Sequence, residues 1–258
     1  MLPHALSLGH RASLVQRGRW HYGADYIAVY YRVSAQQARR LLPEPLEPRE
    51  ELAVAYVTEI VSLSEADPEA LHENPAGTLY REAAIGLGCS YEGREGIYFP
   101  CMWVDKDWSL VRGLLNGYPK KMADEIAMSK PHPLNPLIGP ARPGLRLSGY
   151  CVRQGSRLLW LRLTLRRQGG EADLRRFGSV FGLRLFPATH QEQAEVRELV
   201  EVLREPGGVA NVWVGDAELE LGEARNEELL PLRPREVLYG AWYSAGFTIA
   251  GARVLRRL

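Results

Sequence analysis

Leucine occupies every second position from Leu159 to Leu165, and polar or aromatic residues stand between the leucines. A period of two is typical of a β-strand with one buried face, because successive side chains point to opposite sides. Residues 145–153 precede this run, and the turn-forming pair Gln154–Gly155 separates the two. The pattern predicts an antiparallel hairpin in the second half of the chain.

The other strand predictions rest on runs rich in tyrosine, isoleucine and valine. These runs cover residues 22–33, 52–63, 79–91, 97–104, 211–221 and 236–255. The turn-like residues 92–96 join two of the runs into a long hairpin. Residues 64–76 are polar and contain two prolines, which predicts a loop.

Two short helices are expected. Ser34 can cap a helix over residues 35–42, which ends before Pro43. Asp105 or Asp107 can cap the second helix, and residues 116–119 (Asn-Gly-Tyr-Pro) end it. The hydrophobic residues that fall on one face of this second helix are Trp108, Val111, Leu114 and Leu115.

Many short strands with few helices predict a mainly β (α+β) fold, in which an antiparallel sheet closes wholly or partly on itself. Residues 191–203 fit either a helix or a strand, because their hydrophobic spacing is helical while their composition suits both. No repeat or linker divides the sequence, so we expect residues 1–258 to form a single domain.

Charge and composition exclude several classes of function. The chain has 32 basic and 31 acidic residues and a net charge of +1, which does not favour nucleic acid or an anionic membrane as a partner. The N-terminal residues 2–15 contain no continuous apolar run of signal-peptide length, and nowhere do 18 apolar residues follow one another. A cytoplasmic protein with a small-molecule partner is the expectation.

Neither cysteine nor histidine spacing suggests a metal site. Cys89, Cys101 and Cys151 lack the close pairs of a zinc site and are expected to be reduced. The six histidines are scattered along the chain without paired spacing. We therefore expect no metal ligands.

Lysine is rare in this chain, and two of its four lysines are adjacent, at Lys120 and Lys121. An amine can lose its proton and attack a carbonyl, which a guanidinium does not do in proteins. At neutral pH an ordinary lysine is uncharged in roughly one molecule in 2,500. A catalytic role therefore requires a lowered pKa, through burial or a neighbouring cation.

Burial is expected to be the larger of these two effects. On a strand, Lys120 and Lys121 would point to opposite faces, on the order of 10 Å apart. Their repulsion would then be roughly 1.7 kcal/mol, about one pKa unit, whereas burial lowers a lysine pKa by up to about 3–5 units. Lys121→Gln should therefore leave the pKa of Lys120 lowered.

A catalytic amine also needs a group that moves protons. Glu82 opens the otherwise apolar run 83–89, and a carboxylate on the inner face of a closed sheet could serve this purpose or hold a substrate.

Four segments, in order, resemble the acetoacetate decarboxylase family. They are residues 43–47 (Pro-Glu-Pro-Leu-Glu), 80–82 (Tyr-Arg-Glu), 98–105 and 117–121 (Gly-Tyr-Pro-Lys-Lys). Beyond residue 140 only the succession of short strands agrees.

The resemblance implies a cone-like β-barrel with a buried pocket, usually in a homo-oligomer, and no cofactor. It implies that Lys120 forms a Schiff base with a small oxo acid, with Lys121 as its electrostatic neighbour and Glu82 as the adjacent carboxylate. Tyr118 and Met102 would be substrate-binding pocket walls. Acetoacetate decarboxylase is itself the established example of a lysine activated by burial and by a second cation.

The sequence departs from the family pattern at three places. Ala24 and Tyr56 stand where the decarboxylases carry an arginine and a second glutamate, and residues 112–114 (Arg-Gly-Leu) replace Gly-Arg-Glu. Glu59 or Arg32 could compensate only from the opposite face of their strands.

Three hypotheses remain at this point. The first is a Schiff-base lyase that acts on a small oxo acid, by default through decarboxylation of a 3-oxo acid such as acetoacetate. The second keeps Lys120 as the nucleophile but changes the reaction to aldol or dehydration chemistry on a larger oxo acid. The third is a non-catalytic barrel that binds a small ligand or serves as a structural subunit.

Overall fold

The computed structural model describes residues 4, 6, 8, 13–175, 177–187, 189–190 and 194–258, with the side chain of residue 50 left out. The strands are β1 (Trp20–Arg32), β2 (Glu47–Ser64), β3 (Leu79–Tyr91), β4 (Arg94–Val104), β5 (Lys120–Met122), β6 (Glu125–Met128), β7 (Arg146–Arg153), β8 (Ser156–Gln168), β9 (Ser179–Pro187), β10 (Ala194–Leu221) and β11 (Glu236–Arg257). The helices are α1 (Ala35–Leu41), α2 (Ala70–Glu73) and α3 (Asp107–Leu115), with single 3-10 turns at Pro75–Gly77, Glu171–Asp173 and Leu230–Leu232.

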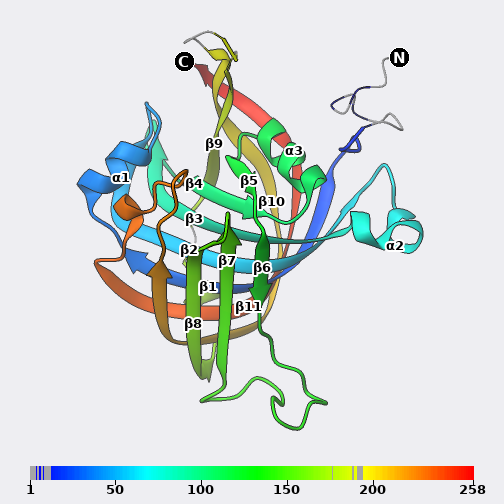
Figure 1. Cartoon of the computed structure of the whole chain (residues 1–258), viewed down its shortest axis with the longest axis vertical. Coiled ribbons are helices and arrows are strands. Elements are labelled where there is room, and N and C mark those ends of the chain that lie inside the picture. Colours follow the sequence, from blue (N-terminus) through cyan, green and yellow to red (C-terminus); the bar gives the residue numbers. More distant parts are fainter. Residues whose placement is uncertain are drawn as a thin grey trace.

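Seven strands form a closed ring (Figure 1). Their order is β11-β1-β2-β3-β4-β9-β10, and β10 pairs again with β11. The pairing is antiparallel around this ring except between β4 and β9, which run parallel. The short β5 also joins β4 in parallel. The expected mainly β fold with few short helices is confirmed.

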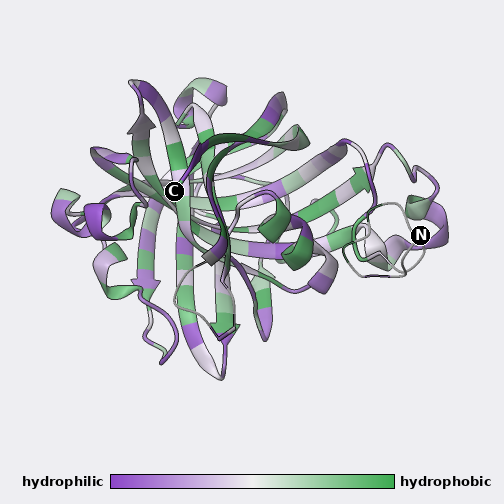
Figure 2. Cartoon of the chain, turned by 90° about the horizontal axis from the view of Figure 1, so that it is seen from above, coloured by the Kyte–Doolittle hydropathy of each residue, from purple (hydrophilic) through white to green (hydrophobic). Residues whose placement is uncertain are grey.

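A second layer covers part of the outside of the ring. From β10 the sheet continues through β8 and β7 to β6, and these strands lie across β1 and β2 (Figure 1). The alternation of hydrophobic and hydrophilic residues along the strands is visible in Figure 2. On β8, Leu159, Leu161, Leu163 and Leu165 are buried in the core between the two layers, as the leucine period predicts.

β1 is buried on both faces. Ile27, Val29 and Tyr31 belong to the core between the layers, whereas Tyr22, Tyr26 and Tyr30 belong to a second cluster on the opposite face. The second cluster lies inside the ring. A strand buried on both sides reads as a nearly continuous hydrophobic run, which explains why residues 22–33 show little alternation.

The predicted strands are present, and several details differ from expectation. Residues 64–76 are not only loop, since they contain α2 and the first residues of a 3-10 turn. The turn between β3 and β4 is shorter than 92–96, because Glu92 and Gly93, both with positive φ, suffice to reverse the chain. The ambiguous residues 191–203 are strand from Ala194 onward, and 191–193 lie outside the described residues.

The N-cap position of Ser34 is confirmed, whereas the caps predicted for the second helix are wrong. Ser34 occupies the N-cap position of α1 without a side-chain bond, and Glu51 accepts a hydrogen bond from the Ala35 amide instead. The N-cap of α3 is Lys106, with Asp107 as the first helical residue. The buried face of α3 also differs from the predicted hydrophobic one. It carries Ser109, Arg112 and Gly113, because α3 packs against the side chain of Lys120.

Strands from both halves of the chain close the ring, since β1 adjoins β11 and β4 adjoins β9. Organisation as a single domain over residues 1–258 stays a prediction, which this shared ring supports. No helix among the described residues is long and apolar enough to cross a membrane.

Candidate active site

A cavity of about 750 Å³ lies inside the ring. Each of the seven ring strands contributes to its wall, and α3 and β5 contribute residues as well. Tyrosine is the commonest residue of the lining, at Tyr22, Tyr26, Tyr30, Tyr56, Tyr80, Tyr118 and Tyr243. The cavity therefore offers aromatic surface beside its charged groups.

Lys120 is one of these charged groups. It begins β5, where its parallel neighbour on β4 is Met102, and its side chain is buried against the cavity. Its amine Nζ lies 2.8 Å from Glu82 Oε2 and donates a hydrogen bond of 3.1 Å to Ser109 Oγ. The rings of Tyr80 and Tyr118 lie beside Nζ, with their centroids 5.2 and 6.0 Å away.

The end of α3 delivers the chain to this position. Gly117 has a φ of +88°, and the amides of Gly117 and Tyr118 donate to the carbonyls of Leu114 and Gly113. These two bonds form the Schellman motif that commonly ends helices at a glycine. The predicted stop is confirmed, and it places Lys120 one short turn beyond the helix whose side it contacts.

α3 makes room for the lysine through Gly113. A Cβ atom at this position would lie 2.3 Å from Lys120 Cδ and 2.7 Å from its Cε. The aliphatic part of Lys120 therefore runs against the backbone of α3, and any larger residue at position 113 would displace it. Ser109, Arg112 and Gly113 are the buried residues of α3, at the i, i+3, i+4 spacing of one helix face.

Burial is the largest cause that lowers the pKa of Lys120 below its ordinary value of 10.5. The nearby guanidinium of Arg112 lowers the pKa further, and the carboxylate of Glu82 opposes both effects. The expected dominance of burial is confirmed. The second cation is Arg112, whereas the sequence had suggested Lys121.

Arg112 is buried with an incomplete set of partners. Its Nη2 donates to Ser62 Oγ at 3.2 Å, while Nη1 has no partner and no described carboxylate pairs with it. Four aromatic rings surround its Cζ, those of Trp20, Tyr22, Tyr80 and Trp108, with centroids 4.1 to 5.6 Å away. Aromatic faces stabilise a guanidinium without neutralising its charge. The cavity therefore holds an unneutralised cation beside Lys120.

Glu82 also faces the cavity and is buried. Tyr56, from the neighbouring β2, donates a hydrogen bond of 2.7 Å to Glu82 Oε1, while Oε2 faces the lysine. One carboxylate thus connects an amine to a phenol. Tyr118 and Met102 line the same cavity, so the structure brings four of the five predicted site residues together.

Lys121, the fifth, points to the opposite face. Its Nζ lies 2.9 Å from Glu227 Oε2 and donates to the carbonyl of Asn226. The side chain of Glu227 is buried, and its Oε1 accepts a hydrogen bond from Trp103 Nε1 and lies 3.0 Å from Arg153 Nε. Because Lys121 is occupied with this buried carboxylate, it tethers β5 to the chain around residue 227.

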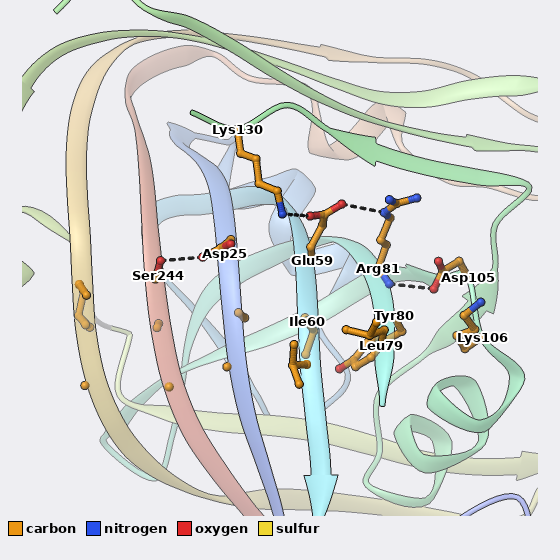
Figure 3. Close-up of a pocket in the computed structure, with 18 residues that line it drawn as sticks. Asp25, Glu59, Ile60, Leu79, Tyr80, Arg81, Asp105, Lys106, Lys130 and Ser244 are labelled. Carbon is orange, nitrogen blue, oxygen red and sulfur yellow. Dashed lines mark hydrogen bonds and ion pairs between the residues drawn. The ribbon is translucent and has the colours of Figure 1, made fainter. Parts of the chain in front are cut away.

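A second cavity, of about 950 Å³, is lined by residues of β1, β2, β3, β10 and β11 and shares Ile60 and Tyr80 with the first (Figure 3). Glu59 pairs there with Lys130 and Arg81, and the Arg81 amide donates to Asp105. Lys120 and Glu82 do not line this cavity. The smaller cavity is therefore the one that holds the reactive groups.

The two residues that could have compensated for the sequence departures do not reach Lys120. Glu59 lines the second cavity, and Arg32 pairs with Glu236 at a distance of 3.4 Å. Ala24 is buried and brings no charge. Tyr56, in contrast, contacts Glu82 directly, so this departure contributes to the site.

Sequence reasoning missed Ser109, Arg112 and Gly113. Their i, i+3, i+4 spacing, which puts all three on one face of the helix before Lys120, could have identified them. A search for hydrophobic residues does not find this face, because its residues are polar or small. Among the described residues, no group of three or more histidine, cysteine, aspartate or glutamate side chains could hold a metal ion.

Comparisons with known proteins agree with this picture. The family model described as acetoacetate decarboxylase (ADC) matches residues 3–258. Acetoacetate decarboxylase 1 of Mesorhizobium japonicum is 26% identical over 235 residues, which cover 90% of this chain and 85% of the relative. Acetoacetate decarboxylase of Ralstonia nicotianae is 26% identical over 234 residues, with the same coverage.

Solved structures extend the comparison to the whole fold. An acetoacetate decarboxylase-like enzyme from Sphingomonas wittichii RW1 is 43% identical, with a TM-score of 0.93 over 96% of this chain and 97% of that one. The enduracididine biosynthesis enzyme MppR, solved in complex with pyruvate, is 26% identical, with a TM-score of 0.86 over 95% and 93% of the two chains. The chain belongs to the acetoacetate decarboxylase family and is an enzyme of that superfamily.

Proposed function

We propose that this enzyme binds a 2-oxo acid as a Schiff base on Lys120 and forms or breaks a carbon–carbon bond next to the imine by aldol chemistry. The observation that carries the proposal is the unneutralised guanidinium of Arg112, buried beside the lysine. Lys120 is the nucleophile, Glu82 the proton-transfer group, and Arg112 the group that holds the substrate carboxylate.

Arg112 favours a reaction in which the carboxylate remains. Guanidinium and carboxylate form strong charge-assisted hydrogen bonds, and Nη1 is available for one. This interaction stabilises the substrate only while the carboxylate keeps its charge. Loss of carbon dioxide would weaken it in the transition state, whereas proton removal at carbon 3 leaves it intact.

The proton transfers can be assigned to Glu82 and Tyr56. Glu82 accepts a proton from the Lys120 ammonium, and the neutral amine adds to the carbonyl carbon of the substrate. The protonated Glu82 returns its proton to the carbinolamine oxygen, so that water leaves and the iminium forms. Glu82 then removes a proton from carbon 3 to give an enamine. Tyr56 holds the carboxylate in place through these steps.

The enamine carbon attacks an aldehyde, and the alkoxide that results takes the proton from Glu82. Water then adds to the iminium and releases the product from Lys120. A cavity of about 750 Å³ leaves room for a second reactant beside the bound acid. MppR, which shares the fold, has been solved with the condensation product of pyruvate and imidazole 4-carboxaldehyde.

Decarboxylation of a 3-oxo acid such as acetoacetate is the second candidate. The names of the curated relatives favour it, since those from Mesorhizobium japonicum and Ralstonia nicotianae are both acetoacetate decarboxylases. It uses the same iminium on Lys120, with carbon dioxide leaving in place of the carbon 3 proton.

Product analysis separates the two candidates. The enzyme is incubated with pyruvate and an aldehyde, and separately with acetoacetate, beside the Lys120→Met variant as the control. We expect a condensation product from the first mixture and little carbon dioxide from the second, with neither in the variant. Carbon dioxide from acetoacetate without any condensation product would favour the decarboxylase instead.

A further inference from the structure

Another arginine of the cavity has no carboxylate partner among the described residues, and it belongs to the exposed part of the wall. Arg204 of β10 lines the cavity, and its Cζ lies 4.1 Å from the centroid of the Phe247 ring. It forms no ion pair within the described part of the chain. Unlike Arg112, its side chain is exposed, so it stands where the cavity meets solvent.

One stacked aromatic pair connects the two arginines. Phe247 of β11 stacks on Tyr22 of β1 with ring centroids 4.6 Å apart, and the Tyr22 centroid lies 5.1 Å from Arg112 Cζ. Arg112 therefore adjoins one ring of the pair and Arg204 the other. An extended molecule lying along this pair would have a guanidinium near each end.

The charge of Arg204 acts on the interior of the cavity. Burial raises the pKa of Tyr118 above its ordinary value, and Arg204 is the largest opposing influence. The same holds for Tyr26 and Tyr243. The neighbouring Arg253, which also lines the cavity, is different because Glu201 pairs with it at 2.6 Å. Of these two arginines, Arg253 has a carboxylate partner and Arg204 has none among the described residues.

We infer that the preferred substrate is an oxo acid with a second anionic group, at the end of the molecule remote from the reacting carbonyl. Arg112 holds the carboxylate next to the imine, and Arg204 binds the distal carboxylate. The aromatic pair between them contacts the aliphatic chain. This inference rests on the proposed function. It assigns the substrate specificity of the enzyme to Arg204, which takes no part in bond formation.

Imine trapping with matched acids tests the inference. 2-Oxoadipate is compared with 2-oxohexanoate, which has the same chain length but no distal charge, by cyanoborohydride reduction and mass measurement. We expect half-maximal trapping at about fivefold lower concentration for 2-oxoadipate, the effect of a partly exposed ion pair, and a smaller preference at high ionic strength. Arg204→Gln should remove the preference for 2-oxoadipate over 2-oxohexanoate.

Arg253→Gln is the matched control, since this cavity-lining arginine already has a carboxylate partner, and it should keep the preference. Equal trapping of the two acids by the unaltered enzyme would overturn the inference, as would a preference that persists in Arg204→Gln. If neither acid is trapped, the proposed function fails. Calorimetric binding of 2-oxoadipate to the enzyme and to Arg204→Gln then decides the inference separately, because it requires no imine; equal affinities would contradict it.

Discussion

The amine of Lys120 and the guanidinium of Arg112 face the same ring, at 5.2 and 5.6 Å from the centroid of Tyr80. Two cations this close in a buried site repel each other, and the repulsion favours the uncharged form of the lysine. A bound carboxylate between them would relieve it. The same pair of residues can therefore activate the nucleophile and recognise the substrate.

Arg112→Gln should separate these two roles. Loss of the cation raises the pKa of Lys120, because one cause that lowers it is removed, and it weakens binding of the substrate carboxylate. We expect the concentration of pyruvate needed for half-maximal imine trapping to rise about tenfold or more, the effect of losing a charge-assisted hydrogen bond. The pH at which trapping becomes half-maximal should also rise. An unchanged concentration and an unchanged pH profile would contradict both roles.

Lys121→Gln should leave the chemistry largely intact and lower stability. Lys121 points away from the cavity and pairs with the buried Glu227, so the variant leaves that carboxylate with fewer partners. The free energy of unfolding should fall by about 1–3 kcal/mol. Denaturant unfolding measures this loss, and titration of the Lys120 amine should still give a lowered pKa. A return of that pKa to its ordinary value would show that Lys121 acts on the nucleophile after all.

Gly113→Ala should displace the nucleophile. The new methyl group would overlap the side chain of Lys120, and a displacement of about 1 Å can reduce activity about 100-fold. Because alanine favours helix by about 1 kcal/mol over glycine, the loss of activity should exceed any loss of stability. Gly23→Ala is the control, since a Cβ there meets no atom within 4 Å. The account of Gly113 is wrong if both variants trap pyruvate as the unaltered enzyme does.

Tyr56→Phe removes the 2.7 Å hydrogen bond that the Tyr56 hydroxyl donates to the Glu82 carboxylate. We expect kcat to fall about tenfold or more, the effect of losing a hydrogen bond to a charged group, while the substrate still binds to Lys120. Steady-state kinetics beside imine trapping measure the two effects. Equal losses in trapping and turnover would show that Tyr56 shapes the cavity and does not orient the carboxylate.

The lowered pKa of Lys120 also makes a prediction about stability. Between that lowered pKa and 10.5 the unfolded chain binds more protons than the folded chain, so the free energy of unfolding rises with pH in this window. Lys120→Met lacks this contribution. The stability of the unaltered enzyme relative to the variant should therefore increase as the pH rises through the window, as measured by urea unfolding. A constant difference would mean that the lysine has the same pKa in both states.

The sequence predicted those parts of the site that follow from local patterns or from the family resemblance. The motif around Lys120 and the position of Glu82 identified a pair that the fold brings within 2.8 Å. The turn at Gly117 was predicted because a glycine after a helix has a known conformational role. The alternating leucines of β8 predicted its buried face, because successive side chains of a strand point to opposite sides.

The remainder depends on contacts that no local pattern reveals. Lys121 meets Glu227 across 106 positions of the chain, so its partner could not be read from the sequence around it. The parallel pairing of β4 with β9 has no local signal either. Arg112 belongs to the face of α3 that contacts Lys120. The prediction from hydrophobic residues placed the buried face of this helix elsewhere.

Reductive trapping with pyruvate tests the central claim most directly. The enzyme is treated with pyruvate and cyanoborohydride, digested, and the modified peptide is sequenced by mass spectrometry beside the Lys120→Met variant. The account predicts one N-(1-carboxyethyl) adduct on the side chain of Lys120 and none in the variant. Absence of an adduct with pyruvate, 2-oxoadipate and acetoacetate, or an adduct on another lysine, would contradict it.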